Sequence, residues 1–166
     1  RQRLADRLNQ SLCSKLTVIA APAGYGKTST VLEWIELINV PHAWITIGKG
    51  DNDNISFWRY ISAGLDIVLP GISMETESVF ASDESFRSNT HINILLDGLF
   101  DISTDFVLVL DDLHFIENPS VYDSLSCFID YMPSNIHLIV ISRTEPHIKL
   151  AKLRLKDELI RIHAKH

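Results

Sequence analysis

The sequence predicts an α/β domain of three layers, in which helices cover both faces of a parallel sheet of about five strands. Short apolar segments alternate along the chain with stretches whose apolar residues recur at helical spacing. Parallel strands need crossover connections, and the right-handed sense of these connections places helices on both faces of the sheet. Residues 106–110 are all apolar, as is typical of a strand that is covered on both sides.

The composition bounds the function. The chain has 166 residues, the size of one domain, and its 46% of hydrophobic and 22% of charged residues are typical of a globular protein. No apolar run reaches the ~20 residues that a membrane helix needs, so we expect no membrane partner. The net charge of −6 makes the chain a poor candidate for holding a DNA backbone by itself.

The cysteines and the chain ends suggest where the protein works. Cys13 and Cys127 lie far apart and form no C-x-x-C pair, which favours a reducing, cytoplasmic compartment. The chain starts at Arg1 without a signal peptide, and its last six residues carry no helix-stop or turn signal. We therefore expect residues 1–166 to be one domain cut from a longer protein.

In the first half of the chain, the pattern predicts two strands and two helices. The strands are expected at residues 16–20 and 42–47. Helical spacing of apolar residues predicts the first helix at 29–39. The second is expected to follow the polar turn at 48–54, with Asn54 or Ser56 as its cap, and to end near residue 69 before a Pro-Gly pair.

In the second half, residues 71–90 are rich in Ser, Thr and Glu, and we expect a loop there with about one helical turn. The remaining elements are predicted from apolar spacing and from the positions of prolines. They are helices at 92–102 and from 119 to before 133, and strands at 106–110, 136–141 and 159–162.

The first strand leads into a glycine-containing loop, residues 21–28 (APAGYGKT). It fits the P-loop pattern G-x-x-x-x-G-K-[ST] except that Ala21 replaces the first glycine. Glycines let backbone N–H groups turn toward a phosphate, and the next helix adds its positive dipole end. Lys27 would reach the β- and γ-phosphates, and the Thr28 hydroxyl would bind Mg²⁺. The candidate nucleotide-binding residues are Ala23, Gly24, Tyr25, Gly26, Lys27, Thr28 and Ser29.

Polar residues follow two further strands at the edge where ligands bind in parallel sheets. Asp111 and Asp112 come directly after four apolar residues, the arrangement of a Walker B motif; Asp111 would hold Mg²⁺ through water, and Asp112 would orient or deprotonate the attacking water. Ser142 or Arg143, after the fourth strand, would sense the γ-phosphate. The alternatives without a function are that Asp111 and Asp112 are solvated aspartates of a turn and that Arg143 is an exposed arginine at the end of a strand. The scattered histidines suggest no metal site.

Taken together, these motifs resemble the MalT-like group of large LuxR-family transcriptional activators, which are STAND-class signalling ATPases. Alanine in place of the first glycine is part of that group's pattern. The resemblance extends from about residue 3 to residue 162. The segments that carry it are residues 16–28, 43–46, 50–53, 108–116, 141–146 and 150–154.

The resemblance implies a regulatory domain that binds ATP and ADP with Mg²⁺ and hydrolyses ATP slowly. ADP would accompany a resting monomer, and ATP with an inducer a self-associating form. DNA would be bound only through a C-terminal helix-turn-helix that this chain lacks, as it lacks the sensor region. By position, Lys27, Asp112 and Arg143 would serve hydrolysis, Thr28 and Asp111 would hold the metal, and residues 1–8 would lie near the adenine. Gly48-Lys49 departs from the acidic residues of the family.

Two other classes of function stay open. A P-loop enzyme proper would be a motor ATPase or a small-molecule kinase, although a kinase lid is usually rich in arginine and residues 71–90 contain only Arg87. A nucleotide-independent interaction module would not need the intact Lys27, Thr28 and Asp111-Asp112. No N-K-x-D motif for guanine occurs, which favours ATP. Near the C-terminus, Lys149, Lys152, Arg154 and Lys156 form either a weak phosphate-contacting strip or a solvated helix face.

Overall fold

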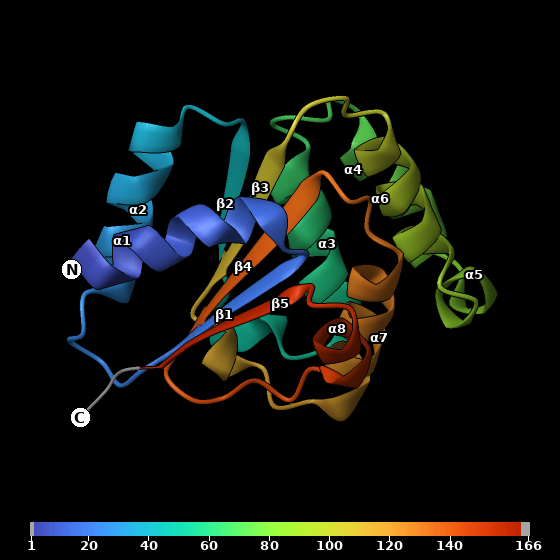
Figure 1. Cartoon of the computed structure of the whole chain (residues 1–166). Helices are drawn as coiled ribbons and strands as arrows, with labels where there is room; N and C mark the ends of the chain where they lie inside the picture. The colour runs from blue at the N-terminus through green and yellow to red at the C-terminus, as the bar shows by residue number, and fades with distance from the viewer. Residues whose placement is uncertain (1, 164–166) are drawn as a thin grey trace.

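Five parallel strands form one sheet in the order β2-β3-β4-β1-β5, as a computed structural model of the chain shows (Figure 1). The structure describes residues 2–163, with the side chains of residues 2, 3, 85 and 86 left aside. The predicted parallel sheet of five strands is confirmed. The strands are β1 (Leu16–Ala20), β2 (His42–Thr46), β3 (Phe106–Asp111), β4 (Ile136–Ser142) and β5 (Leu159–His163).

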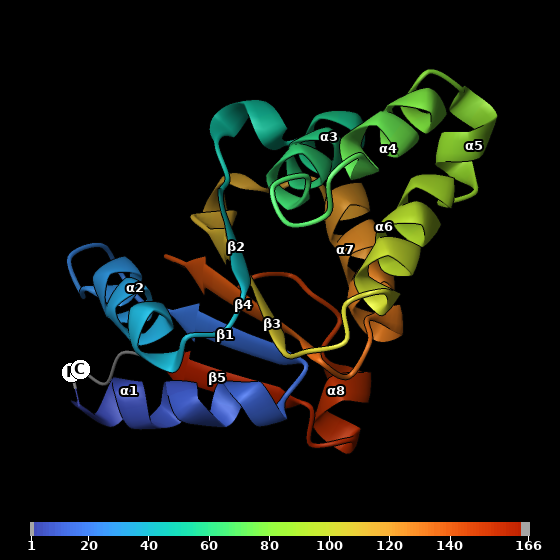
Figure 2. The same ribbon diagram turned by 90° about the horizontal axis from the view of Figure 1, so that it is seen from above.

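Helices cover both faces of this sheet (Figure 2). Successive side chains of a strand point to opposite faces, so Val18 enters the larger core and its neighbour Ile19 the smaller one. This is why the central strands are apolar throughout: burial is complete along β1, β3 and β4.

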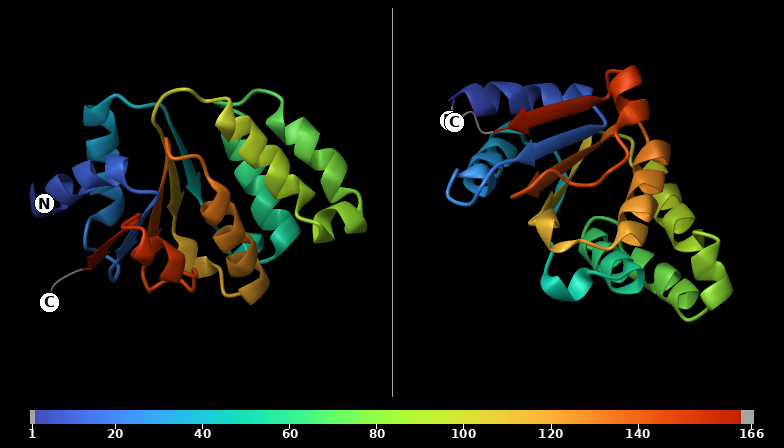
Figure 3. Two further views of the ribbon diagram at one scale, coloured as in Figure 1. Left: turned by 45° about the vertical axis from the view of Figure 1, so that its right-hand side comes forward. Right: turned by 90° about the horizontal axis from the view of Figure 1, so that it is seen from below.

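The smaller core lies under α1 (Gln2–Asn9) and α2 (Lys27–Ile38). The indole nitrogen of Trp34 donates a hydrogen bond to Oδ1 of Asn9 over 2.9 Å and so links the two helices. Figure 3 shows α1 running beside the edge strand β5, and the buried Leu8 and Ile162 belong to one cluster there.

The larger core lies under the remaining helices, with Trp58 fully buried at its centre. The Trp58 ring packs edge-on against Phe57, and its N–H donates to the Ser124 hydroxyl over 2.9 Å. The helices on this side are α3 (Asn54–Leu65), α4 (Ile72–Phe80), α6 (Thr90–Phe100), α7 (Pro119–Tyr131) and α8 (Ala151–Leu155), with α5 (Asp83–Arg87) joining α4 to α6. Among the described residues, no helix combines the length and apolar character needed to cross a membrane.

The prediction of a loop at 71–90 is wrong, because α4 and α5 occupy most of that segment. The four buried residues of α4 are Ile72, Thr76, Val79 and Phe80, which recur at helical spacing despite the polar composition around them. Gly71 starts the helix with a φ of 94°, and its N–H donates to the Asp66 carboxylate over 3.0 Å.

Other differences concern element boundaries. The first helix after the glycine loop begins at Lys27, two residues earlier than predicted, and α3 ends at Leu65 rather than near residue 69. The cap of α3 is Asp53, whose carboxylate accepts the Ser56 N–H over 2.9 Å, instead of Asn54 or Ser56. The short α8 was not predicted. The prediction for α7, from the N1 proline to before Pro133, is confirmed.

Candidate functional site

The carboxyl ends of β1, β3 and β4 bring the predicted site residues to one edge of the sheet. Ala20 of β1 stands in register with Ser142 of β4, and the Ala21 N–H donates to the Ser142 carbonyl over 3.2 Å. The glycine loop therefore leaves β1 directly beside the end of β4. Asp111 ends β3 on the other side of β4.

The glycine loop owes its shape to two left-handed residues. Gly24 has a φ of 83° and Gly26 a φ of 68°; a Cβ at either would meet no atom within 4 Å, so backbone dihedral and not space requires glycine. Ala21 has no positive φ, which explains why alanine is tolerated where the pattern has glycine. Gly26 caps α2, and its carbonyl accepts both the N–H and the hydroxyl of Thr30. The first N–H groups of α2 thus face the loop, as in anion-binding loops.

Lys27 folds back into the glycine loop. Its Nζ donates to the carbonyl of Ala21 over 2.6 Å and to that of Pro22 over 2.8 Å. Burial lowers the pKa of Lys27, and the nearby charge of Arg143 lowers it further, while the aspartates oppose both effects. The ammonium is held where a phosphate in the loop would meet it.

Thr28 and Asp111 form the second part of the site. The Thr28 hydroxyl lies 3.4 and 3.3 Å from the two carboxylate oxygens of Asp111, which is only 5% exposed. Burial, and then the charge of Asp112, raise the pKa of Asp111. A hydroxyl beside a desolvated carboxylate is an oxygen donor set of the kind Mg²⁺ prefers. Among the described residues no cluster of three or more His, Cys, Asp or Glu could hold a metal ion, so Mg²⁺ here would also need water and phosphate oxygens.

Asp112 begins the short 3₁₀ turn η3 (Leu113–Phe115) with a left-handed φ of 58°. Its N–H donates to Oδ1 of Asp111 over 2.9 Å. The turn brings His114 back toward it, with 3.6 Å between Nδ1 of His114 and Oδ1 of Asp112. Sequence reasoning missed His114, and its position two residues after an acidic pair was the available signal.

The two polar candidates at the end of β4, Ser142 and Arg143, differ in exposure. Ser142 is buried and its hydroxyl accepts the Thr144 N–H over 3.3 Å. Arg143 is exposed, and its charge lowers the pKa of both Lys27 and His114. Two residues on, Glu145 pairs with Arg161 and lies 3.8 Å from His163 of β5.

The structure gives the polar turn at 48–54 a structural role. The Asp51 carboxylate accepts the Gly48 N–H over 2.7 Å. The Asn52 side-chain oxygen accepts the N–H groups of Glu117 and Asn118, just before α7. Of the N-terminal segment expected near an adenine, Arg1 lies outside the described residues.

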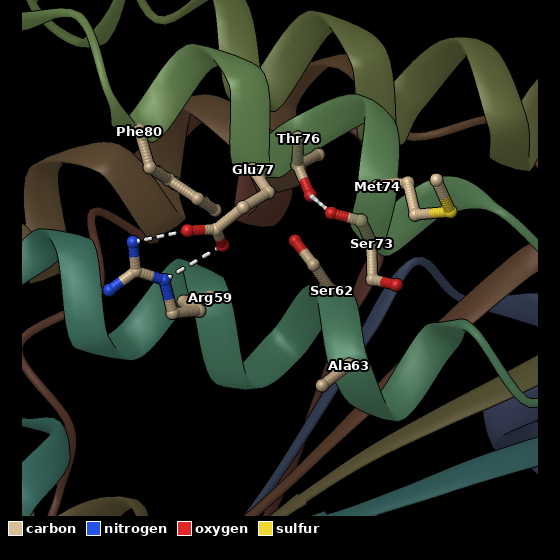
Figure 4. Close-up of a pocket in the computed structure, with 8 residues that line it drawn as sticks. All are labelled: Arg59, Ser62, Ala63, Ser73, Met74, Thr76, Glu77 and Phe80. Carbon is tan, nitrogen blue, oxygen red and sulfur yellow. Dashed lines mark hydrogen bonds and ion pairs between the residues drawn. The ribbon is translucent and has the colours of Figure 1, made fainter.

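A separate cavity of about 280 Å³ between α3 and α4 does not belong to this site (Figure 4). Arg59 fills one side of it and forms two hydrogen bonds with Glu77, of 2.9 and 2.7 Å. The Ser62 and Thr76 hydroxyls donate to backbone carbonyls of their own helices. These polar groups already have hydrogen-bond partners within the protein, so the cavity offers little to a ligand.

Comparisons with curated proteins give matches along nearly the whole chain. No model of a known protein family matches it. It is 30% identical over 162 residues to the HTH-type transcriptional regulator MalT of Klebsiella pneumoniae, and 29% identical over 163 residues to that of Yersinia pestis. Each match covers 98% of this chain and 18% of the relative, so the chain spans less than a fifth of the length of these proteins.

Solved structures support the fold. A signal transduction ATPase with numerous domains and a tetratricopeptide repeat sensor, from Pyrococcus horikoshii, matches with a TM-score of 0.62 and 16% identity, over 98% of this chain and 22% of that one. The ORC1 protein of Aeropyrum pernix, solved with DNA, matches with a TM-score of 0.59 and 17% identity, over 98% and 43%. These likenesses confirm the predicted three-layer fold of P-loop NTPases.

Proposed function

The chain is similar over 98% of its length to one segment of the MalT regulators, and from this premise we propose that it is the ATP- and ADP-binding switch domain of a cytoplasmic transcriptional regulator. The proposal leaves inducer sensing and DNA binding to other parts of such a regulator. Self-association would accompany the ATP state of the full-length protein.

One observation carries the proposal: the Lys27 ammonium lies inside the glycine loop, and the Thr28 hydroxyl beside it meets the buried Asp111 carboxylate. Lys27 would bind the β- and γ-phosphates in place of the Ala21 and Pro22 carbonyls that it now contacts. Thr28 and Asp111 would hold Mg²⁺, which when bound neutralises charge on the phosphates. Exchange of the two carbonyls for phosphate oxygens gives Lys27 charge-assisted hydrogen bonds.

Hydrolysis would be carried out by the residues around this pair. Asp112 would orient the attacking water and accept its proton, and Arg143 would bind the γ-phosphate oxygens with its planar guanidinium. A switch must hold ATP long enough to signal, so we expect turnover below the ~1–10³ s⁻¹ of ordinary enzymes. Turnover of tens per second would favour the alternative, a motor ATPase or a small-molecule kinase.

Nucleotide binding by the variant Lys27→Ala tests the proposal. Calorimetry with ATP and Mg²⁺, and with ADP and Mg²⁺, should show a loss of about 1.5–3 kcal/mol, the range of a hydrogen bond to a charged group. Lys49→Ala, which removes an exposed lysine outside the glycine loop, serves as the matched control and should bind as the wild type does. Equal affinity of Lys27→Ala and the wild type would end the assignment of the glycine loop to phosphate.

A further inference from the structure

His114 has a buried imidazole whose hydrogen-bonding capacity is unused among the described residues. Its side chain is 12% exposed, and neither ring nitrogen has a hydrogen-bond partner there. Buried polar groups are nearly always paired, so an orphaned pair of nitrogens at the edge of a candidate site calls for a functional explanation.

The geometry aims this ring at Asp112. Because Asp112 adopts a left-handed conformation, η3 turns the chain sharply enough to bring residues 112 and 114 together. The His114 ring packs against Phe115, with ring centroids 4.4 Å apart. At 3.6 Å, Nδ1 is too far from Oδ1 of Asp112 for a hydrogen bond, but a small side-chain rotation closes the distance.

The environment of His114, above all its burial, favours the neutral imidazole. Burial lowers the pKa of His114; Arg143 and Lys27 lower it further, whereas Asp112 and Asp111 oppose them. A neutral imidazole carries one N–H and one lone pair. A carboxylate only accepts, so the contact with Asp112 needs the proton on Nδ1.

We propose that His114 is a positioning residue, which donates its Nδ1–H to the Asp112 carboxylate and fixes that carboxylate for its work on water. The proposal rests on the proposed function. In the step concerned, the water oxygen bonds to the γ-phosphorus, the bond from that phosphorus to the bridging oxygen breaks, and ADP leaves. One water proton passes to the outer oxygen of Asp112, and the oxygen held by His114 stays in place.

The tautomer of His114 tests this geometry without any nucleotide. Long-range ¹H–¹⁵N NMR on protein with labelled histidine should show the Nδ1–H form, with the signal assigned by its loss in His114→Asn. In Asp112→Gly, which suits the left-handed backbone and removes the acceptor, the ring should change to the Nε2–H form. An Nε2–H ring in the wild type would overturn the proposal.

Hydrolysis by two variants tests the consequence. His114→Asn keeps a donor near the position of Nδ1, whereas His114→Leu keeps the volume and removes the donor. We expect single-turnover hydrolysis to fall at least tenfold in His114→Leu and to be partly retained in His114→Asn. The affinities of both for ADP should stay within twofold of the wild type, as should that of the control His42→Leu, an exposed histidine on β2.

A double variant separates positioning from a structural role. In an Asp112→Asn background, His114→Leu should slow hydrolysis no further, because both changes remove one coupled unit. Additive losses, or losses in both His114 variants that follow a lowered melting temperature, would overturn the proposal. Failure of the proposed function would look different: Lys27→Ala would bind ATP normally, while the tautomer of His114 would still report its contact with Asp112.

Discussion

The fold disfavours the ionised form of Asp111. Burial and the charge of Asp112 raise its pKa, so the folded state holds the Asp111 proton more strongly than the unfolded state does. Stability linked to that proton is present below the ordinary aspartate value of 3.8 and is lost as the pH rises through the raised value. Near neutral pH the Asp111 carboxylate therefore lowers the stability of the nucleotide-free protein, although the same carboxylate suits the site to a cation.

The variant Asp111→Asn should thus be more stable than the wild type without nucleotide. We expect its melting temperature at pH 7 to rise by about 2–4 °C, the shift for about 1 kcal/mol in a domain of this size. Calorimetric melting checks this, with Asp97→Asn on the exposed face of α6 as control. The same variant should lose the Mg²⁺ dependence of ATP binding. A lower melting temperature would contradict the argument.

His91 should make the protein sensitive to mild acid. It is 1% exposed, lies between the rings of Trp58 and Phe80, and burial lowers its pKa from 6.5 to about 4. As the pH falls below 6.5, His91 becomes protonated in the unfolded state, whereas in the folded state it becomes protonated only near pH 4. Between pH 7.5 and 5 this single group should lower the free energy of unfolding by about 2 kcal/mol.

Urea unfolding of the wild type and of His91→Phe at both pH values measures that loss. The variant should lose less stability than the wild type by about 2 kcal/mol over the same interval. The exposed His42→Phe should behave as the wild type does. Parallel losses in the wild type and in His91→Phe would assign the acid sensitivity to other groups.

Sequence reasoning located Lys27, Thr28, Asp111 and Arg143 at one edge because parallel strands end there together, so positions along the chain translate directly into positions in space. Their chemical roles stay predictions. His114 could not be found in this way, since its place depends on the left-handed turn at Asp112.

Among the elements, β5 is held to the site by a side chain as well as by its strand partner. The Glu145 carboxylate, in the segment after β4, pairs with Arg161 and lies 3.8 Å from His163. Both partners of the Arg161 pair are about one-third exposed, which limits its contribution to stability to about 0.5–1 kcal/mol. The pair connects the segment that carries Arg143 to an edge strand.

Replacing Glu145 by Gln should loosen β5 locally. Hydrogen exchange measured by mass spectrometry should accelerate about two- to fivefold at residues 159–163, as a loss of that size predicts, and stay unchanged in β3. Glu36→Gln on the exposed face of α2 is the control. Unchanged exchange in β5 would show that backbone pairing with β1 alone holds this strand.

Strands were easier to predict than helices for a physical reason. A strand that is buried on both faces is a continuous apolar run in the sequence. In α4, by contrast, only four residues are buried, and polar residues separate them: Ile72, Thr76, Val79 and Phe80. Its start depends on the left-handed Gly71 and on a carboxylate five residues upstream, neither of which has a local signature. The five-residue helices α5 and α8 are too short for a helical period to register.

On the scale of the whole molecule, charge argues against DNA binding by this chain. The net charge is −6, and the structure neutralises part of the basic strip near the C-terminus. Lys149 pairs with Asp123 over 2.8 Å, and Lys152 with Asp130 over 3.0 Å. Two of the four basic residues of the strip are therefore paired with aspartates of α7, which weakens the strip as a contact surface for phosphates.

Gel-shift titration with random duplex DNA at two salt concentrations should show no binding in the ~10⁻⁴–10⁻⁶ M range of non-specific binders. The double variant Asp123→Lys with Asp130→Lys removes both acidic partners and should gain weak, salt-sensitive binding. Tight, salt-dependent binding by the wild type would contradict the charge argument.

The strand order also dictates when the site can exist during synthesis. Among the described residues, β1 pairs with β4 and β5 alone, and these strands leave the ribosome about 120 and 140 residues after it. At the usual ~5–20 residues per second, the strand that leads into the glycine loop waits about 6–24 s for its first partner. The glycine loop can therefore take its place only after β4 has been made, and the domain should bind nucleotide only once translation has passed that strand.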